Sequence, residues 1–149
     1  MREWRPAMNT STTVPAPPLR ILVCGQYPEV NLTLAGWLSE LEDMVVINTR
    51  TNTLDALVMA RKMQANVALL DFEMDGVMLP HTISLFKMIS PATAIIVLAQ
   101  KLTPVIHRRC KDLGAVYVFE KSTDLEQLAG ALQAVRDKLL IGKPLDQNL

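Results

Sequence analysis

Cysteine and histidine are scarce in this chain of 149 residues, which has two of each. Cys24 and Cys110 stand far apart and match no metal-ligand spacing, so we expect both to be reduced thiols, as is usual in the cytoplasm. His81 and His107 have no Cys or second His at ligand spacing, and we expect both at the surface. These shortages argue against a zinc site and against a disulfide framework.

An excess of one charge is also missing, because 15 Lys and Arg residues balance 15 Asp and Glu residues. That balance predicts no attraction of the chain as a whole to nucleic acid or to an anionic membrane. No apolar run approaches the roughly 18 residues that span a bilayer. Residues 1–18 are polar, rich in Thr and Pro, and lack the apolar core of a secretory signal. We therefore expect a cytoplasmic protein with a flexible N-terminal extension at residues 1–18.

Short apolar runs alternate with amphipathic stretches from Leu19 onward, and the apolar runs predict strands buried on both faces of a parallel sheet. The predicted strands are Leu19–Cys24, Met44–Ile47, Val67–Leu70, Ala94–Leu98 and Ala115–Phe119. The predicted helices are Pro28–Glu42, Thr53–Gln64 with Thr53 as N-cap, Pro80–Ile89, Pro104–Leu113, and a last helix that runs from a capping box of Thr123 and Glu126 to Leu139.

Five strands that alternate with five helices predict an α/β fold, a doubly wound (flavodoxin-like) five-stranded parallel sheet with strand order 2-1-3-4-5. One domain at residues 19–141 accounts for the whole pattern, and residues 142–149 form a C-terminal tail. Open sheets of this kind place their sites at the carboxyl ends of the strands.

Asp71 stands at such an end, directly after the apolar run Val67–Leu70, and Glu73 and Asp75 follow within four positions. A carboxylate there is a nucleophile, a metal ligand or a structural cap. Two other functions, flavodoxin-like cofactor binding and hydrolysis, lack support elsewhere in the chain. Residues 25–28 have too little Gly, Ser or Thr to cradle a cofactor phosphate, and no Ser or Cys has a His at a hydrolase spacing. We therefore do not expect an enzyme.

Four segments, in order, carry a family resemblance: Arg20–Pro28, Leu69–Asp75, Ile95–Ala99 and Gly114–Lys121. On these segments the chain resembles the receiver domain of bacterial two-component response regulators over nearly its whole folded part. The resemblance implies an Asp that takes a phosphoryl group from a kinase phosphohistidine, with Mg²⁺ held by that Asp and by an acidic residue after the first strand. A Lys and a Thr or Ser hydroxyl then contact the phosphoryl oxygens, since phosphoryl transfer depends on positioning and charge neutralisation.

Only part of that set is present. Asp71 matches the phosphoacceptor and Lys121 matches the lysine. Gly25 and Gln26 replace the acidic pair, which leaves Glu73 and Asp75 as the possible substitutes for a metal ligand. Ala99 replaces the switch hydroxyl, and Val118 stands at the position of the switch aromatic. The chain thus resembles a degenerate receiver, or pseudo-receiver, in which neither Mg²⁺ nor another cofactor is expected.

These departures predict a stand-alone signalling and protein-interaction module that works without phosphorylation. The alternative is a single-domain response regulator that accepts a phosphoryl group on Asp71 from a histidine kinase, with weakened Mg²⁺ binding. Expected partners are a histidine kinase or another regulator, and a homodimer could form through the fourth helix, fifth strand and fifth helix. Arg108, Arg109 and Lys111 give that face a basic cluster, which is either a partner surface or a solvated helix face. Membrane binding is not expected, and nucleic acid is an unlikely partner.

Overall fold

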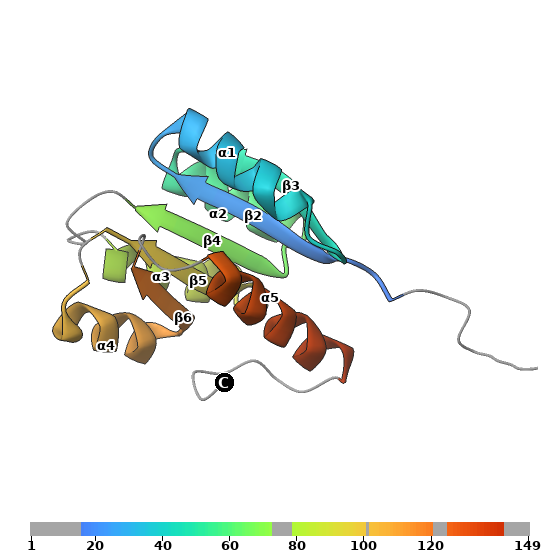
Figure 1. The fold of residues 1–149 in the computed structure, drawn as a ribbon. Helices are drawn as coiled ribbons and strands as arrows, with labels where there is room; N and C mark the ends of the chain where they lie inside the picture. Colours follow the sequence, from blue (N-terminus) through green and yellow to red (C-terminus); the bar gives the residue numbers. More distant parts are fainter. Residues whose placement is uncertain (1–15, 73–78, 101, 121–124, 142–149) are drawn as a thin grey trace, which may run out of the picture.

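A computed structural model of the chain describes residues 16–72, 79–100, 102–120 and 125–141. Within this part, five parallel strands form one sheet: β2 (Leu19–Gly25), β3 (Met44–Arg50), β4 (Val67–Phe72), β5 (Ala94–Ala99) and β6 (Ala115–Glu120). Their order is β3-β2-β4-β5-β6, which confirms the predicted 2-1-3-4-5 order and the α/β class (Figure 1). The extension predicted at residues 1–18 falls mostly outside the described residues, and the tail at 142–149 falls entirely outside them.

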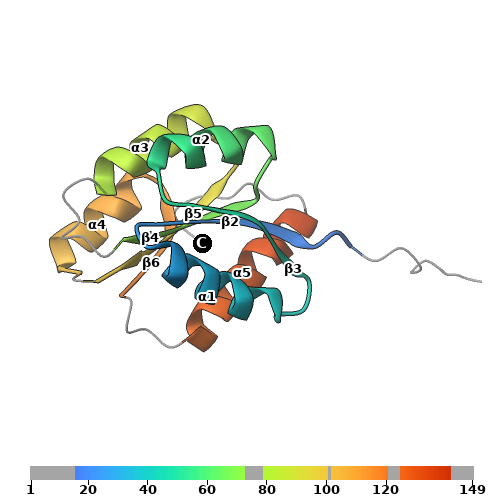
Figure 2. The ribbon, with the colours of Figure 1, turned by 90° about the horizontal axis from the view of Figure 1, so that it is seen from above.

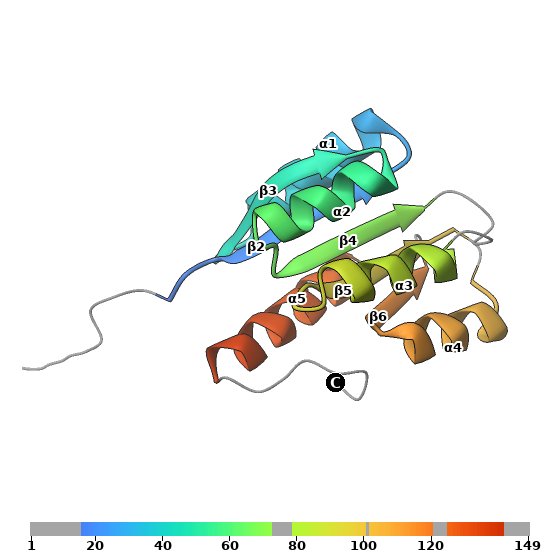
Figure 3. The same ribbon diagram turned by 180° about the vertical axis from the view of Figure 1, so that it is seen from behind.

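In the described residues, four helices connect successive strands: α1 (Pro28–Ser39), α2 (Thr53–Lys62), α3 (Leu79–Ile89) and α4 (Pro104–Leu113). A fifth helix, α5 (Leu125–Leu140), follows β6. Helices α1 and α5 cover one face of the sheet, and α2, α3 and α4 cover the other (Figures 2 and 3). None of the helices in the described ranges is long and apolar enough to cross a membrane.

Two hydrophobic cores lie on the two faces of the sheet, and they divide the side chains of each strand between them. On β2, Ile21 and Val23 pack toward α1 and α5, whereas Leu22 and Cys24 pack toward α2, α3 and α4. All four are at most 1% exposed, as expected for a strand covered on both faces. Because of this alternation, the side chain of each residue at the carboxyl end of a strand can contact only the helices on its own face of the sheet.

Strand β6 breaks the alternation once. The pairing register of β5 with β6 shifts so that Ile95 opposes Ala115 and Ile96 opposes Tyr117. Val116 is the extra residue of this irregularity, and both Val116 and Tyr117 lie on the α1–α5 side. A bulge of this kind restores the alternation one residue later. Val118 therefore faces the α2–α4 core.

Two predicted helix boundaries were wrong. Helix α1 ends at Ser39 and not near Glu42, because residues 40–43 turn into β3 with Asp43 at a φ of +66°. Asp tolerates this left-handed conformation better than most residues do. Helix α2 is capped by Asn52 and not by Thr53, since the Asn52 side chain accepts hydrogen bonds from the backbone N–H groups of Leu54 and Asp55. Thr123 of the predicted capping box lies outside the described residues.

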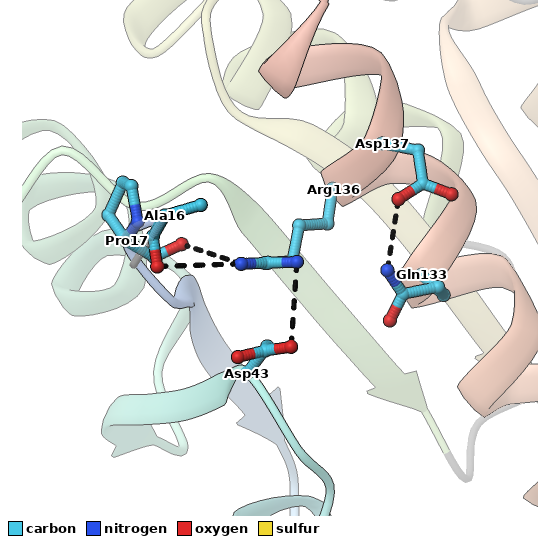
Figure 4. Close-up of polar contacts among 6 residues, drawn as sticks. All are labelled: Ala16, Pro17, Asp43, Gln133, Arg136 and Asp137. Carbon is cyan, nitrogen blue, oxygen red and sulfur yellow. Dashed lines mark hydrogen bonds and ion pairs between the residues drawn. The ribbon is translucent and has the colours of Figure 1, made fainter. Parts of the chain in front are cut away.

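The turn before β3 is joined to α5 by a buried arginine, Arg136 (Figure 4). One terminal nitrogen of Arg136 lies 3.6 Å from the Asp43 carboxylate, and the other donates to the backbone carbonyls of Ala16 and Pro17 at 3.5 and 3.4 Å. The Leu19 N–H donates to the Asp43 carbonyl at 2.8 Å. Arg136 thus links α5 to the segment that enters β2 and to the turn that enters β3.

Replacing Arg136 by Ala is expected to lower the free energy of unfolding by about 1–2 kcal/mol. The substitution removes both the hydrogen bonds to the two backbone carbonyls and the packing of the aliphatic part of the Arg136 side chain. Urea unfolding measures this change. Asp137→Ala is the matched control on the next position of α5, since it removes only an exposed hydrogen bond of 3.0 Å from Gln133. That variant is expected to change stability by less than about 0.5 kcal/mol. Equal effects of the two substitutions would contradict the role given to Arg136.

Candidate functional site

Asp71 sits near the carboxyl end of β4, in a row of three residues across the sheet. In the pairing register Gly25 of β2 lies on one side of Asp71 and Leu98 of β5 on the other. Because Val67 and Leu69 face α1 and α5, Asp71 faces the same side. Its residue is only 3% exposed. The strand end thus presents one buried carboxylate between a residue without a side chain and an apolar one.

Asn31 of α1 covers the Gly25 end of this row. It is 1% exposed, and its side-chain nitrogen donates to the Gly25 carbonyl at 3.0 Å and to the Arg50 carbonyl at 3.2 Å. These carbonyls belong to the last residues of β2 and β3. One amide therefore joins α1 to the carboxyl ends of two neighbouring strands. Such bonds satisfy backbone acceptors that the ladder leaves over at a strand end.

An apolar groove of about 490 Å³ opens beside the other end of the row, between α1 and α5. Its apolar lining comes from three elements and consists of Val30, Leu34, Trp37, Leu98 and Leu125. Asp71 lines the groove as well, and Glu29 lies at it on the first turn of α1. The groove thus combines an apolar wall with the exposed acidic residue Glu29, whereas Asp71 is buried. This composition suits a partner whose apolar groups lie next to a basic group that faces Glu29.

The two switch positions lie on the opposite face of the sheet. Ala99 and Val118 are 2% and 7% exposed and pack into the core under α2, α3 and α4. Neither has a polar side-chain atom. Gln26 follows β2 directly and is exposed. The structure therefore places Gly25 beside Asp71, and it places Ala99 and Val118 on the opposite face of the sheet.

Three of the predicted site residues, Lys121, Glu73 and Asp75, lie outside the described residues. Among the residues that the structure does describe, no three His, Cys, Asp or Glu side chains are grouped closely enough to hold a metal ion. Mg²⁺ prefers carboxylate and water oxygens in near-octahedral geometry. The neighbours of Asp71 in the register offer no side-chain oxygen, and so this part of the site does not fit Mg²⁺.

The basic cluster on α4 divides into exposed and engaged groups. Arg108 and Arg109 are exposed. The Lys111 ammonium instead donates to the Val116 carbonyl at 2.8 Å and lies 5.8 Å from the centre of the Tyr117 ring. Tyr117 is in turn stacked on Phe119 with ring centres 5.8 Å apart. His81 and His107 are exposed, as predicted.

Sequence reasoning missed Asn31 and the groove. Asn31 interrupts the helical series of apolar residues in α1, and a polar residue on an otherwise inward-facing turn is the signal that could have indicated a buried hydrogen bond. The groove gave no such signal, because α1 and α5 are far apart in the chain and are placed on the same face only by the order of the strands.

Cys24 carries a thiol, which can act as a nucleophile, but the thiol is held in its protonated form. It stands directly before Gly25 and is 1% exposed. Burial raises the pKa of its thiol from 9.0 to about 11. Burial also raises the pKa of Cys110, against the opposing charge of Arg109. Because the thiolate is the reactive form, neither cysteine supplies a nucleophile near neutral pH.

Comparison with known proteins gives the same architecture. Residues 21–133 match the model of the response regulator receiver domain family. No curated protein sequence matches the chain. A LuxR-family two-component response regulator from Aurantimonas sp. SI85-9A1 has a TM-score of 0.72 at 16% identity, covering 85% of this chain and 88% of its own.

Two further solved structures resemble the chain. The REC domain of RcsB from Salmonella enterica serovar Typhimurium, solved with phosphomimetic BeF3-, has a TM-score of 0.70 at 23% identity, covering 86% of this chain and 92% of its own. The response regulator domain of Thermotoga maritima CheB has a TM-score of 0.66 at 21% identity, covering 80% and 95%. At these identities the likeness establishes the fold.

The raised pKa of Cys24 predicts a loss of stability in alkali. A group that holds its proton more tightly in the folded state contributes fully below its unfolded pKa, and the contribution falls as the pH rises from 9.0 to about 11. The loss is at most about 2–3 kcal/mol. Urea unfolding at a series of pH values should show a shallower decline for Cys24→Ala than for the wild type. Parallel declines would show that the thiol is not the titrating group.

Proposed function

Since the chain belongs to the response regulator receiver domain family, we propose that it is an atypical receiver that binds a protein partner without being phosphorylated. Receiver domains act in two-component signalling with histidine kinases or other proteins. One observation carries the proposal: Asp71 is buried between Gly25 and Leu98, so neither neighbouring strand supplies the oxygen ligands that a metal-dependent phosphoacceptor needs. No catalytic role follows for Asp71.

The groove between α1 and α5 supports partner binding at the same edge. Its five apolar lining residues come from α1, β5 and α5 and surround the approach to Asp71. Two of them, Leu125 and Trp37, combine an exposed or half-buried position with a large apolar surface. Glu29 adds an acidic group at the groove. We therefore assign it to a partner segment that presents apolar side chains next to a basic one.

The exposed side of α4 and β6 is a second candidate surface. Arg108 and Arg109 stand free of the contacts that engage Lys111, and the stacked rings of Tyr117 and Phe119 are half-buried on the edge strand. The surface could hold a second copy of the chain or an acidic partner. Its charge makes any such binding sensitive to salt.

The absence of a phosphorylation response is the first expected outcome. Titration of the ¹⁵N-labelled protein with Mg²⁺ to millimolar concentrations, with and without beryllofluoride as a phosphoryl mimic, should give no saturable shift of the amide signals around Asp71. Asp71→Asn is the matched control. Its Mg²⁺ titration should likewise give no saturable shift, either with or without beryllofluoride. A saturable shift that Asp71→Asn abolishes would establish the alternative, a phosphoryl-accepting regulator.

Partner binding is tested by a photo-crosslinking amino acid placed at Leu125 in the native cells. We expect one crosslinked product whose yield is unchanged by Asp71→Asn, because the groove and not the carboxylate holds the partner. The matched control position is Leu32, which is 64% exposed on α1 and does not line the groove. Equal crosslinking from both positions, or a product lost in Asp71→Asn, would contradict phosphorylation-independent binding at the groove.

A further inference from the structure

We propose that Asn31 occupies the space into which any side chain at position 25 would project, so that Asn31 itself excludes a metal-binding acid there. A Cβ atom built on Gly25 would lie 2.3 Å from the Asn31 side-chain oxygen. Real Cβ atoms essentially never approach an atom of another residue more closely than 3.0 Å. A side chain at position 25 and Asn31 in its present place therefore exclude one another.

Space and not backbone conformation is what requires glycine at position 25. Gly114 is the one described glycine with a φ in the left-handed region, at +123°. Gly25 lies in regular β2 geometry, paired in register with Asp71. Apart from Asn31, the nearest atoms to the added Cβ are the Asp71 carbonyl oxygen at 3.0 Å and the Asp71 Cβ at 3.3 Å. These two contacts are tight but need shifts of only a few tenths of an ångström, so Asn31 is the main obstacle.

Asn31 cannot turn aside without loss, because its amide orientation is fixed by the groups around it. The side-chain nitrogen donates to the Gly25 and Arg50 carbonyls, and only the nitrogen can donate to these acceptors. The oxygen must then point toward Gly25. There it accepts no hydrogen bond from any described residue. The two donated bonds thus hold a buried oxygen in a place where it gains nothing, and a rotation that cleared position 25 would break both of them.

Gly25 and Asn31 therefore form a coupled pair: beside Asp71, the Asn31 side chain fills the space that a side chain at position 25 would need. Restoring acids at positions 25 and 26 alone would not restore a metal site, since the first acid would meet Asn31. The inference rests on the proposed loss of metal-dependent phosphorylation and names the residue that maintains that loss. It concerns positions 25, 26 and 31 only, and a partner at the α1–α5 groove does not enter it.

The coupling is tested first by stability. In urea unfolding, Gly25→Ala should lower the folding equilibrium constant by at least about tenfold in the wild type and by less than about threefold in an Asn31→Ala background. Gly36→Ala is the matched control on α1, where an added Cβ meets no atom within 4 Å. It should stabilise the protein equally in both backgrounds. Equal losses from Gly25→Ala with and without Asn31 would overturn the proposal, whereas a Gly25→Ala protein that folds only with Asn31→Ala would support it.

The second test uses Mn²⁺ as a spectroscopic stand-in for Mg²⁺, with free Mn²⁺ measured by electron paramagnetic resonance. Gly25→Asp/Gln26→Asp should bind Mn²⁺ at least about tenfold more weakly than the same pair combined with Asn31→Ala. Circular dichroism checks that each variant is folded. Equal affinity of the double and triple variants, or a triple variant that binds no better than the wild type, would overturn the role of Asn31. Asp71→Asn in the triple variant should abolish the gain.

Loss of metal-dependent phosphorylation and exclusion by Asn31 are distinguished by the wild-type and triple-variant proteins. If the wild type itself bound Mn²⁺ tightly and responded to beryllofluoride through Asp71, the proposed function would be wrong. If the wild type gave no response and the triple variant also gave none, the proposed function would stand and the exclusion by Asn31 would be wrong.

Discussion

The Asn31 amide joins three elements at the one edge of the sheet where this fold places its sites. It donates to the last carbonyls of β2 and β3 from the second turn of α1. Those bonds settle how closely α1 approaches the sheet, and the close approach leaves Gly25 no room for a side chain. The residue beside Asp71 is therefore decided by helix packing as well as by the chemistry of the pocket. Deep burial strengthens the constraint, because breaking buried hydrogen bonds costs more than breaking exposed ones.

The strands could be predicted from the sequence because each contains an apolar run, and the strand order followed from the alternation with helices. The runs of β2 and β5 are almost wholly buried. The edge strand β3 is mostly half-buried and continues to Arg50, three polar residues past the predicted end at Ile47. Boundaries were less predictable, since they depend on local polar contacts. Asn52 and Thr53 are both good N-caps, and only the backbone geometry selects Asn52. The end of α1 depends on the left-handed Asp43, which in turn bonds to Leu19 and Arg136. No local pattern in residues 39–43 predicts contacts with residues as far away in the sequence as Leu19 and Arg136.

The candidate site was predictable in its strand-end positions and not in its surroundings. Asp71 and Gly25 could be placed because they follow apolar runs, and the register sets them side by side. The role of Asn31 depends on distances between α1 and two strand ends, which spacing along the chain does not encode. The groove has the same origin, since Leu125 of α5 and Trp37 of α1 line it together although they are far apart in the chain. Residues whose roles depend on tertiary contacts are the hardest to predict from a single sequence.

The two faces of the sheet also bear on whether an event at Asp71 could reach α4. Asp71 faces α1 and α5, whereas Ala99 and Val118 face α2, α3 and α4. A signal passed through the sheet requires side chains that can adopt two positions. Ala99 has no side-chain torsion, and the buried β-branched Val118 is restricted at χ1. A switch needs differential contacts in two states, and these residues offer one packed arrangement. The α4 face is therefore expected to keep one shape whatever happens at Asp71. A partner that binds the α4 face would therefore bind equally well whether or not Asp71 is modified.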